Sequence, residues 1–372
     1  MAKIGQNDQS GNGEWDVRLL MKVDLSTPAP APEYLIESIV PEDLSALYGD
    51  GGVAKTILAL AEATCIALGR PYLGHQTKCG PVLYIDFEMG AAAINYRAFQ
   101  VALGMGLDRP PAGLHVFTIN GKIANAWDEI RMAIAQYEPL CIYIDSLGAA
   151  LGDEDAIAAK VINPLMSKLQ ALAVPVRLVD HQANLQKGEH YSDKKEFGSA
   201  YKRHRIRASW QVERANVQPE RGLLVMLHHK KVNFGPLRTE PIGVHLTFDG
   251  DAVVISPQDV VDEPGLLEKL QAQDRTLLLV RSKPGITRGA IVEQAGITET
   301  TVLKHLKTLE RLGQIRHEEG EHHNAPWRYF PAREMHHQPE GEGAEVPLYR
   351  GAPPAPPHTS SGSAPPCTTD AH

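Results

Sequence analysis

The fold is decided by one stretch of the sequence, Gly49-Asp50-Gly51-Gly52-Val53-Ala54-Lys55-Thr56. It follows an apolar run and opens a helical pattern of apolar residues. In that context, a glycine-rich turn lets consecutive backbone N–H groups wrap phosphates at the N-terminus of a helix. Lys55 would then bridge the terminal phosphates, and the Thr56 hydroxyl would ligate magnesium. We therefore expect residues 49–56 to bind a nucleoside triphosphate with Mg²⁺.

Ala54 departs from the usual pattern of such loops, which have glycine immediately before the lysine. Alanine fits this place if its backbone φ is helical. The same stretch also contains a Gly49-x-Gly51-x-x-Ala54 string, which a dinucleotide-binding turn could share. That alternative lacks an acidic residue at the end of a second strand about twenty residues further on. A structural glycine turn without a ligand is the plainer alternative.

Outward from the loop, short apolar runs alternate with longer helical patterns from about residue 33 to 256. This alternation is typical of a sheet wound with helices, and continuously apolar runs suit strands buried on both faces. The last segment, 244–255, alternates around Asp249-Gly250, which is a hairpin signal. We expect an α/β domain with a central, mostly parallel sheet over residues 33–256. Its expected strands are 45–48, 82–87, 140–144, 174–179, 208–213 and 223–228.

Two of these runs lead into carboxylates, Asp145 after 140–144 and Glu88 after 82–87. A carboxylate that ends a strand beside the phosphate loop can hold Mg²⁺, and we assign this role to Asp145. In P-loop ATPases of the AAA+ type the next residue is a catalytic glutamate, but here it is Ser146. Glu88 is therefore the better general base, which would orient and deprotonate the attacking water. A solvated residue at a strand end is the plainer interpretation of Glu88.

Taken together, the loop, Glu88, Asp145-Ser146-Leu147 and His181 after the run 174–179 resemble the RecA-like P-loop ATPases. Within that class they resemble the RepA-type hexameric plasmid helicases, over about residues 33–256. The resemblance implies a RecA-like core, ATP and Mg²⁺ as bound groups, and a homo-oligomer, expected to be a hexamer. In that family a polar residue at the end of the fourth strand senses the γ-phosphate, which gives this role to His181. A histidine that only caps the strand by a hydrogen bond is the alternative.

The segment after His181 is rich in basic residues: Lys187, Lys194, Lys195, Lys202, Arg203, Arg205 and Arg207. By the same resemblance, it would line the channel of a ring and follow the phosphate backbone of single-stranded DNA. A solvated charged loop is the alternative.

The family also presents an arginine finger from this stretch to the neighbouring subunit. Arg207 fits that place, and Arg203 and Arg205 compete with it. Lys55 is the only basic residue beside the phosphate loop in the sequence, which also favours a site completed between subunits. Lys231 fits a further family element near the subunit interface, with Lys230 as its competitor.

A second, smaller domain is expected over residues 257–332. Helical patterns at 274–281, 287–295 and 298–312 precede a β segment at 316–330, an order that resembles a winged helix-turn-helix. In the third helix, apolar residues at helical spacing would face the core and leave Lys304, Lys307 and Arg311 toward solvent. The basic excess of this domain is mild, so duplex DNA and a protein partner both remain open.

The bulk composition fits a globular protein with flexible ends. Of the 372 residues, 43% are hydrophobic and 22% are charged, which allows a sizeable core. Residues 1–32 read as a flexible N-terminal arm, and residues 333–372, rich in Pro, Ser and Gly, read as a disordered tail. No apolar run is long enough to span a bilayer, so we expect a cytoplasmic protein without a membrane partner.

Two functions therefore remain open. The first is a Mg²⁺-dependent ATPase that drives a ring-forming replicative DNA helicase or translocase of RepA type, in plasmid or phage replication. The second is a non-motor, ATP-dependent DNA-binding switch. The formal net charge of −8 excludes wholesale coating of nucleic acid but allows a local basic patch to bind DNA. The basic segment favours the motor, and the winged domain fits both.

Overall fold

The computed structural model describes residues 31–152, 159–182, 200–215, 222–319 and 325–332, together with Ser26, Pro28 and His322. Most of the expected arm, the expected tail, and Lys187, Lys194 and Lys195 of the basic segment lie outside these residues. All elements discussed below belong to the unit that spans residues 33–372. Among the described helices, none is long and apolar enough to cross a membrane.

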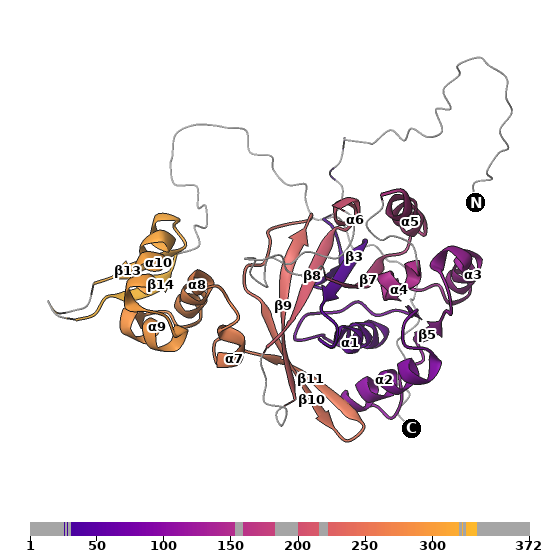
Figure 1. Cartoon of the computed structure of the whole chain (residues 1–372), viewed down its shortest axis with the longest axis horizontal. Helices are drawn as coiled ribbons and strands as arrows, with labels where there is room; N and C mark the ends of the chain where they lie inside the picture. The colour runs from indigo at the N-terminus through magenta and orange to yellow at the C-terminus, as the bar shows by residue number, and fades with distance from the viewer. Residues whose placement is uncertain are drawn as a thin grey trace, which may run out of the picture. The chain divides into compact units, whose positions relative to one another are not determined.

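A nine-stranded sheet forms the centre of the first part of the chain, in the order β11-β10-β9-β8-β3-β7-β6-β4-β5 (Figure 1). The strands from β3 to β8 are mutually parallel, and β9, β10 and β11 are antiparallel. Because β7 lies between β3 and β6, the sheet has the RecA-like strand order, which confirms the expected fold class. The bounds are β3 (Ser45–Gly49), β4 (Val82–Asp86), β5 (Leu114–Thr118), β6 (Cys141–Asp145), β7 (Val176–His181), β8 (Ala208–Arg214), β9 (Leu223–Val232), β10 (Ile242–Asp249) and β11 (Ala252–Gln258).

Helices cover both faces of this sheet, since successive residues of a strand point to opposite faces. In β4, Tyr84 packs on the face of α1 (Lys55–Leu68) and α2 (Ala91–Gly104), whereas Leu83 and Ile85 pack on the other. That other face is covered by η2 (Ile123–Asn125), α3 (Trp127–Tyr137), α4 (Leu147–Leu151) and α5 (Ala159–Ala171), and α6 (Ala200–Arg205) packs beside α5. Apolar residues on both faces explain why the strands read as continuous apolar runs.

The hairpin of β10 and β11 extends from the sheet to α2 (Figure 1). A side-chain carbon at Gly104 would lie 1.9 Å from the carbonyl oxygen of Val253, so only glycine allows this approach. The Tyr96 hydroxyl also donates to the Asp251 carboxylate at 3.2 Å. The hairpin, whose turn the sequence predicted at Asp249-Gly250, is thereby held along α2 from Tyr96 to Gly104.

The second part of the chain has the expected winged helix-turn-helix. It consists of α7 (Pro264–Leu267), α8 (Ala272–Ser282), β12 (Ile286–Thr287), α9 (Arg288–Ala295), α10 (Glu299–Arg311), β13 (Ile315–Glu318) and β14 (Arg328–Pro331). The strands form a sheet in the order β12-β14-β13. In α10, Val302, Leu306 and Leu309 are fully buried, as their spacing predicted.

Four of the described strands were not expected from the sequence: β5, the two-residue β12, and the short pair β1 (Tyr34–Ile36) and β2 (Val40–Pro41). β5 is an edge strand with only one fully buried residue, Leu114. It therefore lacks the continuous apolar run that marks its neighbours. β1 and β2 are too short to show a period, because two or three residues cannot establish an alternation.

Candidate active site

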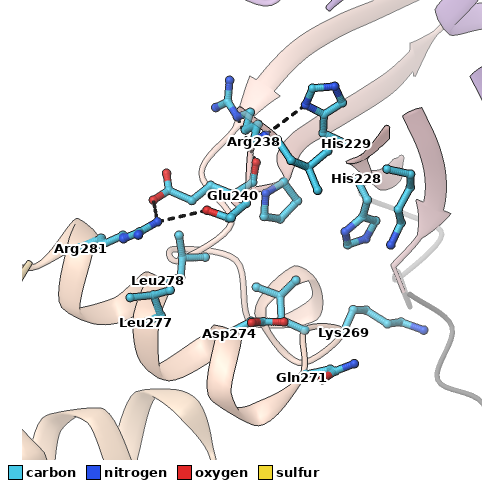
Figure 2. A pocket seen from close by; sticks show the side chains of 15 residues that line it. His228, His229, Arg238, Glu240, Lys269, Gln271, Asp274, Leu277, Leu278 and Arg281 are labelled. Atoms are coloured by element: carbon cyan, nitrogen blue, oxygen red, sulfur yellow. Dashed lines mark hydrogen bonds and ion pairs between the residues drawn. The ribbon is translucent and has the colours of Figure 1, made fainter. Parts of the chain in front are cut away.

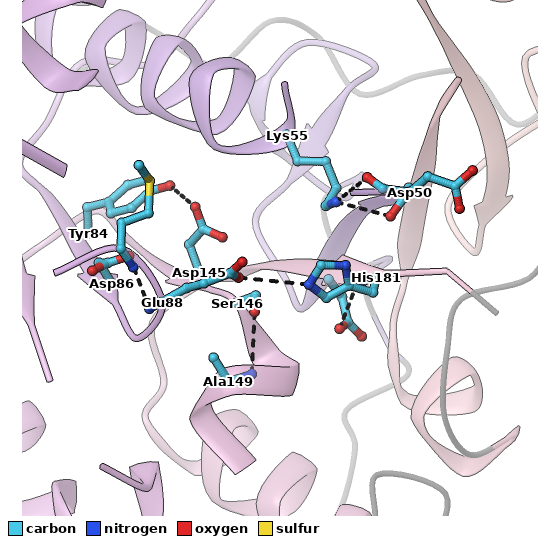
Figure 3. Close-up of polar contacts among 12 residues, drawn as sticks. Asp50, Lys55, Tyr84, Asp86, Glu88, Asp145, Ser146, Ala149 and His181 are labelled. Atoms are coloured by element: carbon cyan, nitrogen blue, oxygen red, sulfur yellow. Dashed lines mark hydrogen bonds and ion pairs between the residues drawn. The ribbon is translucent and has the colours of Figure 1, made fainter. Parts of the chain in front are cut away.

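The phosphate loop joins β3 to α1, as predicted, and holds Lys55 inside it. The Lys55 Nζ donates hydrogen bonds to the carbonyl oxygens of Gly49 at 3.0 Å and Asp50 at 2.7 Å (Figure 3). Burial lowers the pKa of Lys55, while nearby carboxylates, Asp145 foremost, oppose that shift. Glycine is required twice: a side chain at Gly49 would lie 2.6 Å from the carbonyl oxygen of Val212, and Gly52 has a φ of 73°.

Ala54 does not have the helical φ that would make alanine acceptable, so this expectation is wrong. Its φ of 66° and ψ of 24° lie in the left-handed region. A residue with a Cβ costs about 1–2 kcal/mol there, because the Cβ crowds the following carbonyl oxygen. The Ala54 carbonyl accepts the first hydrogen bond of α1, from the Leu58 N–H at 3.0 Å. The loop thus places an unfavourable residue at the cap of the helix.

Glu88 lies in the turn between β4 and α2, and Asp86 builds this turn. The Asp86 carboxylate accepts hydrogen bonds from the backbone N–H groups of Glu88 at 3.3 Å, Met89 at 3.0 Å and Gly90 at 2.8 Å. These bonds fix the backbone and leave the Glu88 side chain half exposed. Glu88 is therefore free to contact a ligand, whereas Asp86 is fully occupied in holding the turn.

Asp145 lies beside Thr56, as a shared metal site requires. Its carboxylate, only 3% exposed, accepts a hydrogen bond from the Tyr84 hydroxyl at 2.6 Å and another from the Thr56 side chain. Burial raises the pKa of Asp145 to about 6, although these two hydrogen bonds oppose the shift. Burial also raises the pKa of Tyr84 well above its ordinary value, so the phenol stays protonated and donates.

The donor set at this place suits Mg²⁺. Magnesium is commonly bound by one or two protein oxygens together with substrate phosphates, rather than by a cage of side chains. Thr56 and Asp145 supply a hydroxyl and a carboxylate next to the phosphate loop. In the described ranges, no group of three or more His, Cys, Asp or Glu side chains could hold a metal by itself.

These residues share one cavity of about 290 Å³ at the carboxyl ends of the parallel strands. His181 reaches it from β7, and its Nε2 lies 3.8 Å from the Glu88 Oε2 (Figure 3). Val53 of the loop is buried in the core and does not line the cavity. The predicted residues that do line it are Gly51, Gly52, Ala54, Lys55, Thr56, Glu88, Asp145 and His181. The structure thus brings together side chains from four separate strand ends.

Five further residues line this cavity that the sequence did not predict: Ile57, Met89, Arg97, Leu223 and Phe248. Arg97 of α2 and Phe248 of β10 are the two whose side chains could contact a nucleotide by charge or stacking. The expectation that Lys55 is the only basic residue at the loop is therefore wrong in space. Arg97 lies on α2, and its guanidinium donates to Gln100 at 3.2 Å. Phe248 is 48% exposed at the hairpin end. An exposed phenylalanine directly before an Asp-Gly turn was the available signal for Phe248, and Arg97 offered none.

Arg207 and Lys231 lie at the opposite end of the strands from this cavity, where the parallel strands begin. Val212 pairs with Gly49, and Arg207 precedes Val212 by five residues along the parallel strand β8. At about 3.3 Å per residue, Arg207 is roughly 16 Å from the phosphate loop. Its Nε lies 3.7 Å from the Asp43 carboxylate. The Lys231 Nζ donates to the backbone carbonyl of Arg203 at 2.5 Å, at the end of α6.

The basic segment is less available for DNA than the sequence suggested. Lys202 is 2% exposed and forms a buried ion pair with Asp180, so it cannot line a channel, and this part of the prediction is wrong. Arg205 is exposed and donates to Gln170 at 2.7 Å. A buried lysine needs a partner charge, and Asp180 supplies it next to His181. Lys202 therefore ties α6 to the strand of the candidate sensor.

The winged domain presents a basic helix face. Lys304, Lys307 and Arg311 are exposed on α10, opposite its buried apolar stripe. On the wing, His317 stacks on Trp327 with ring centroids 4.2 Å apart, and its Nδ1 lies 2.6 Å from the Glu310 carboxylate. On the described part of the wing, Glu318 and Glu319 balance the charges of Arg316 and Arg328. The helix, more than the wing, therefore suits a phosphate backbone.

A second cavity, of about 310 Å³, has different chemistry. Residues of β9, of the connection to β10 and of α8 line it, and Arg281 bridges it by contacts with Thr239 at 3.1 Å and Glu240 at 3.2 Å (Figure 2). Burial lowers the pKa of His229 at its wall to about 4. This second cavity contains neither the phosphate loop nor Glu88 and Asp145. The cavity of about 290 Å³ at the phosphate loop is therefore the candidate active site.

Comparison with known protein families finds two separate matches along the chain. Residues 17–186 match a family described as "AAA domain", and residues 275–316 match one described as "Winged helix-turn-helix DNA-binding". No curated protein matches the sequence significantly. The chain therefore combines an ATPase domain of RecA-like fold with a winged helix-turn-helix.

Among solved structures, two archaeal proteins are similar to this chain. A KaiC-like protein of Pyrococcus horikoshii is 15% identical with a TM-score of 0.41, covering 61% of this chain and 96% of its own. The flagellar accessory protein FlaH of Methanocaldococcus jannaschii is 13% identical with a TM-score of 0.38, covering 58% of this chain and 89% of its own.

Proposed function

We propose that this chain is a Mg²⁺-dependent ATPase that acts on DNA as a ring-forming helicase or translocase of RepA type. The observation that carries the hydrolysis is the cavity at the strand ends, where Lys55, Glu88 and Asp145 meet. Phosphoryl transfer requires positioning and charge neutralisation far more than covalent chemistry. A lysine, a metal-holding pair and a carboxylate base around one cavity supply these.

Each side chain has a task in this proposal. Lys55 neutralises the terminal phosphates, and Thr56 with Asp145 would hold Mg²⁺, which supplies further charge neutralisation when bound. Glu88 orients the attacking water and takes its proton. His181, 3.8 Å from Glu88, is placed to contact the γ-phosphate and Glu88 together. Loss of that phosphate would therefore remove a contact of His181, at the end of β7.

The outer part of the cavity suits a nucleobase. Phe248 offers a half-exposed aromatic ring and Arg97 a planar guanidinium, and both groups stack on flat aromatic partners. Neither contact distinguishes one purine from another by hydrogen bonds. ATP is thus bound mainly through its phosphates, with the base held by stacking.

The position of Arg207 supports the proposed ring. At roughly 16 Å along the sheet from its own phosphate loop, its guanidinium cannot contact the nucleotide of the same chain. In this proposal it reaches the γ-phosphate of a neighbouring copy, in a homo-oligomer such as a hexamer. Lys231 acts on Arg207 indirectly. It donates to the last turn of α6, which ends two residues before Arg207.

Action on DNA is supported by the winged domain and its basic helix face. Single-stranded DNA in the ring channel would couple to hydrolysis, and duplex DNA would bind α10. The second candidate function, a non-motor DNA-binding switch, is favoured by the burial of Lys202, which removes one cation from the channel segment.

The deciding experiment measures ATP hydrolysis with and without single-stranded DNA, and then the unwinding of a forked duplex. Stimulation together with unwinding supports the motor. Stimulation by duplex DNA alone, without unwinding, supports the switch. Absence of any ATP hydrolysis by the folded protein would contradict both.

A further inference from the structure

We propose that Tyr84 is a positioning residue that orients the Asp145 carboxylate for Mg²⁺. This inference rests on the proposed function, because it assumes that Asp145 holds the Mg²⁺ of a bound nucleotide. In the register of the sheet, Tyr84 lies opposite Tyr143, and Asp86 lies opposite Asp145. The Tyr84 hydroxyl reaches diagonally across to the Asp145 Oδ2, at 2.6 Å.

The position of this hydroxyl is rigid. Tyr84 is fully buried, and its ring stacks on that of Tyr143 with centroids 5.7 Å apart and planes 8° from parallel. A packed ring has no second rotamer to occupy in a dense core. By contrast, the last torsion of an aspartate is broad, so the carboxylate orientation is set by its partners. Tyr84 is a fixed partner, whereas Thr56 has to turn its hydroxyl toward the metal.

Orientation matters here because Mg²⁺ demands nearly ideal octahedral geometry. A donor that holds one carboxylate oxygen determines which way the remaining lone pairs face. Partners of this kind commonly change metal affinity or activity by 10–100-fold when they are removed.

Tyr143 provides a matched control in the same place. It is equally buried and belongs to the same stacked pair, but its hydroxyl points to Glu62 of α1 at 3.3 Å. Glu62 is already held by Arg177, through Nε at 3.1 Å and Nη2 at 2.9 Å. Removing either hydroxyl therefore deletes one buried hydrogen bond, but only Tyr84 touches the metal-holding carboxylate.

The test compares Tyr84→Phe and Tyr143→Phe in the full chain. Binding of a fluorescent ATP analogue is measured first in EDTA and then over a Mg²⁺ titration. For Tyr84→Phe we expect unchanged affinity in EDTA and a Mg²⁺ half-saturation raised about tenfold or more. Tyr143→Phe should follow the wild type in both conditions. A Tyr84→Phe titration that superimposes on the wild type, or equal shifts in both variants, would overturn the proposal.

If Tyr84→Phe does not fold, site-specific 3-fluorotyrosine keeps both the ring and the hydroxyl. The fluorine resonance at position 84 should move when Mg²⁺ is added to nucleotide-loaded protein, and the same label at position 143 should not. A resonance at 84 that ignores Mg²⁺ rejects the role of Tyr84. A wild type that binds no nucleotide would instead reject the proposed function, and this inference with it.

Discussion

The two ends of the parallel strands differ in whether their residues can contact a nucleotide bound to the same chain. At the carboxyl ends of the parallel strands, Lys55, Glu88 and Asp145 surround one cavity and are held by contacts within the chain. At the amino ends of the same strands, Lys231 donates to the end of α6, and Arg207 is half-exposed beside Asp43, roughly 16 Å along the sheet from the phosphate loop of its own chain. In the proposed ring, nucleotide binding and completion of the active site are therefore separable, because the second step needs another copy of the chain.

The largest loss of ATP hydrolysis is expected from a substitution at the carboxyl ends of the strands, in the candidate active site. Lys55→Ala should lower ATP hydrolysis by about a thousandfold or more, because a preorganised cation is lost where negative charge develops. The fold should remain, since Lys55 contacts only loop carbonyls. Steady-state turnover and thermal unfolding test this. Lys78→Ala, which removes a surface lysine paired with Glu33 and Glu42, is the control. Unchanged turnover in Lys55→Ala would refute the phosphate loop.

A substitution at the opposite end of the strands should cause a comparable loss of turnover without a loss of ATP binding. Arg207→Ala is expected to reduce hydrolysis by about a thousandfold, the usual contribution of an arginine finger. ATP binding to isolated subunits should not change. Arg203→Ala and Arg205→Ala serve as controls for the neighbouring cations, and either one matching the loss would move the finger to that residue.

Mixing two inactive variants sharpens this comparison. In a mixture of Arg207→Ala and Lys55→Ala proteins, some interfaces pair an intact loop with an intact Arg207, so activity should reappear. The recovery should depend on protein concentration, because the active interface must assemble. Activity that stays absent at every ratio, with no dependence on concentration, would point to a self-contained site. Arg97, which lines the same cavity, would then be the first cation to examine.

Glu88→Gln should separate binding from chemistry within the cavity itself. The amide cannot take a proton, so hydrolysis should fall about a hundredfold or more. The turn should persist, because Asp86 bonds to its backbone N–H groups and not to the Glu88 side chain. Equilibrium binding of ATP and single-turnover hydrolysis measure the two steps. Normal turnover would place the base elsewhere.

Most of the polar residues of the candidate active site could be predicted from the sequence, because they follow strands that are recognisable by themselves. Asp145 and Glu88 end apolar runs, and parallel strands bring such ends together. The contacts that hold these residues could not be predicted in the same way. Tyr84 meets Asp145 across 61 positions of sequence, and its place in a buried run gave no sign of a polar partner.

Errors arose where charge was counted along the chain instead of in space. Lys202 is one of several basic residues in its segment, yet it is the one buried against Asp180. Arg97 is distant from the phosphate loop in sequence, yet the helix that carries it begins at the same cavity. The left-handed Ala54 is an error of another kind, since the residue type gave no hint of the backbone conformation that the loop requires.

The smallest expected effect tests whether the phosphate loop keeps its shape without help from a ligand, as the contacts of Lys55 indicate. In Ala54→Gly, relief of the left-handed alanine contributes about 1–2 kcal/mol. Greater freedom of glycine in the unfolded chain offsets roughly 0.5–1 kcal/mol. A net gain of about 0.5–1 kcal/mol should raise the Tm by about 2 °C. Gly52→Ala is the mirror control, because its φ of 73° is equally left-handed and the added Cβ meets no atom within 4 Å. It should lower the Tm by a similar amount. If Ala54→Gly lowers the Tm while Gly52→Ala leaves it unchanged, the loop of the nucleotide-free protein has another conformation, and this edge of the sheet is not preformed.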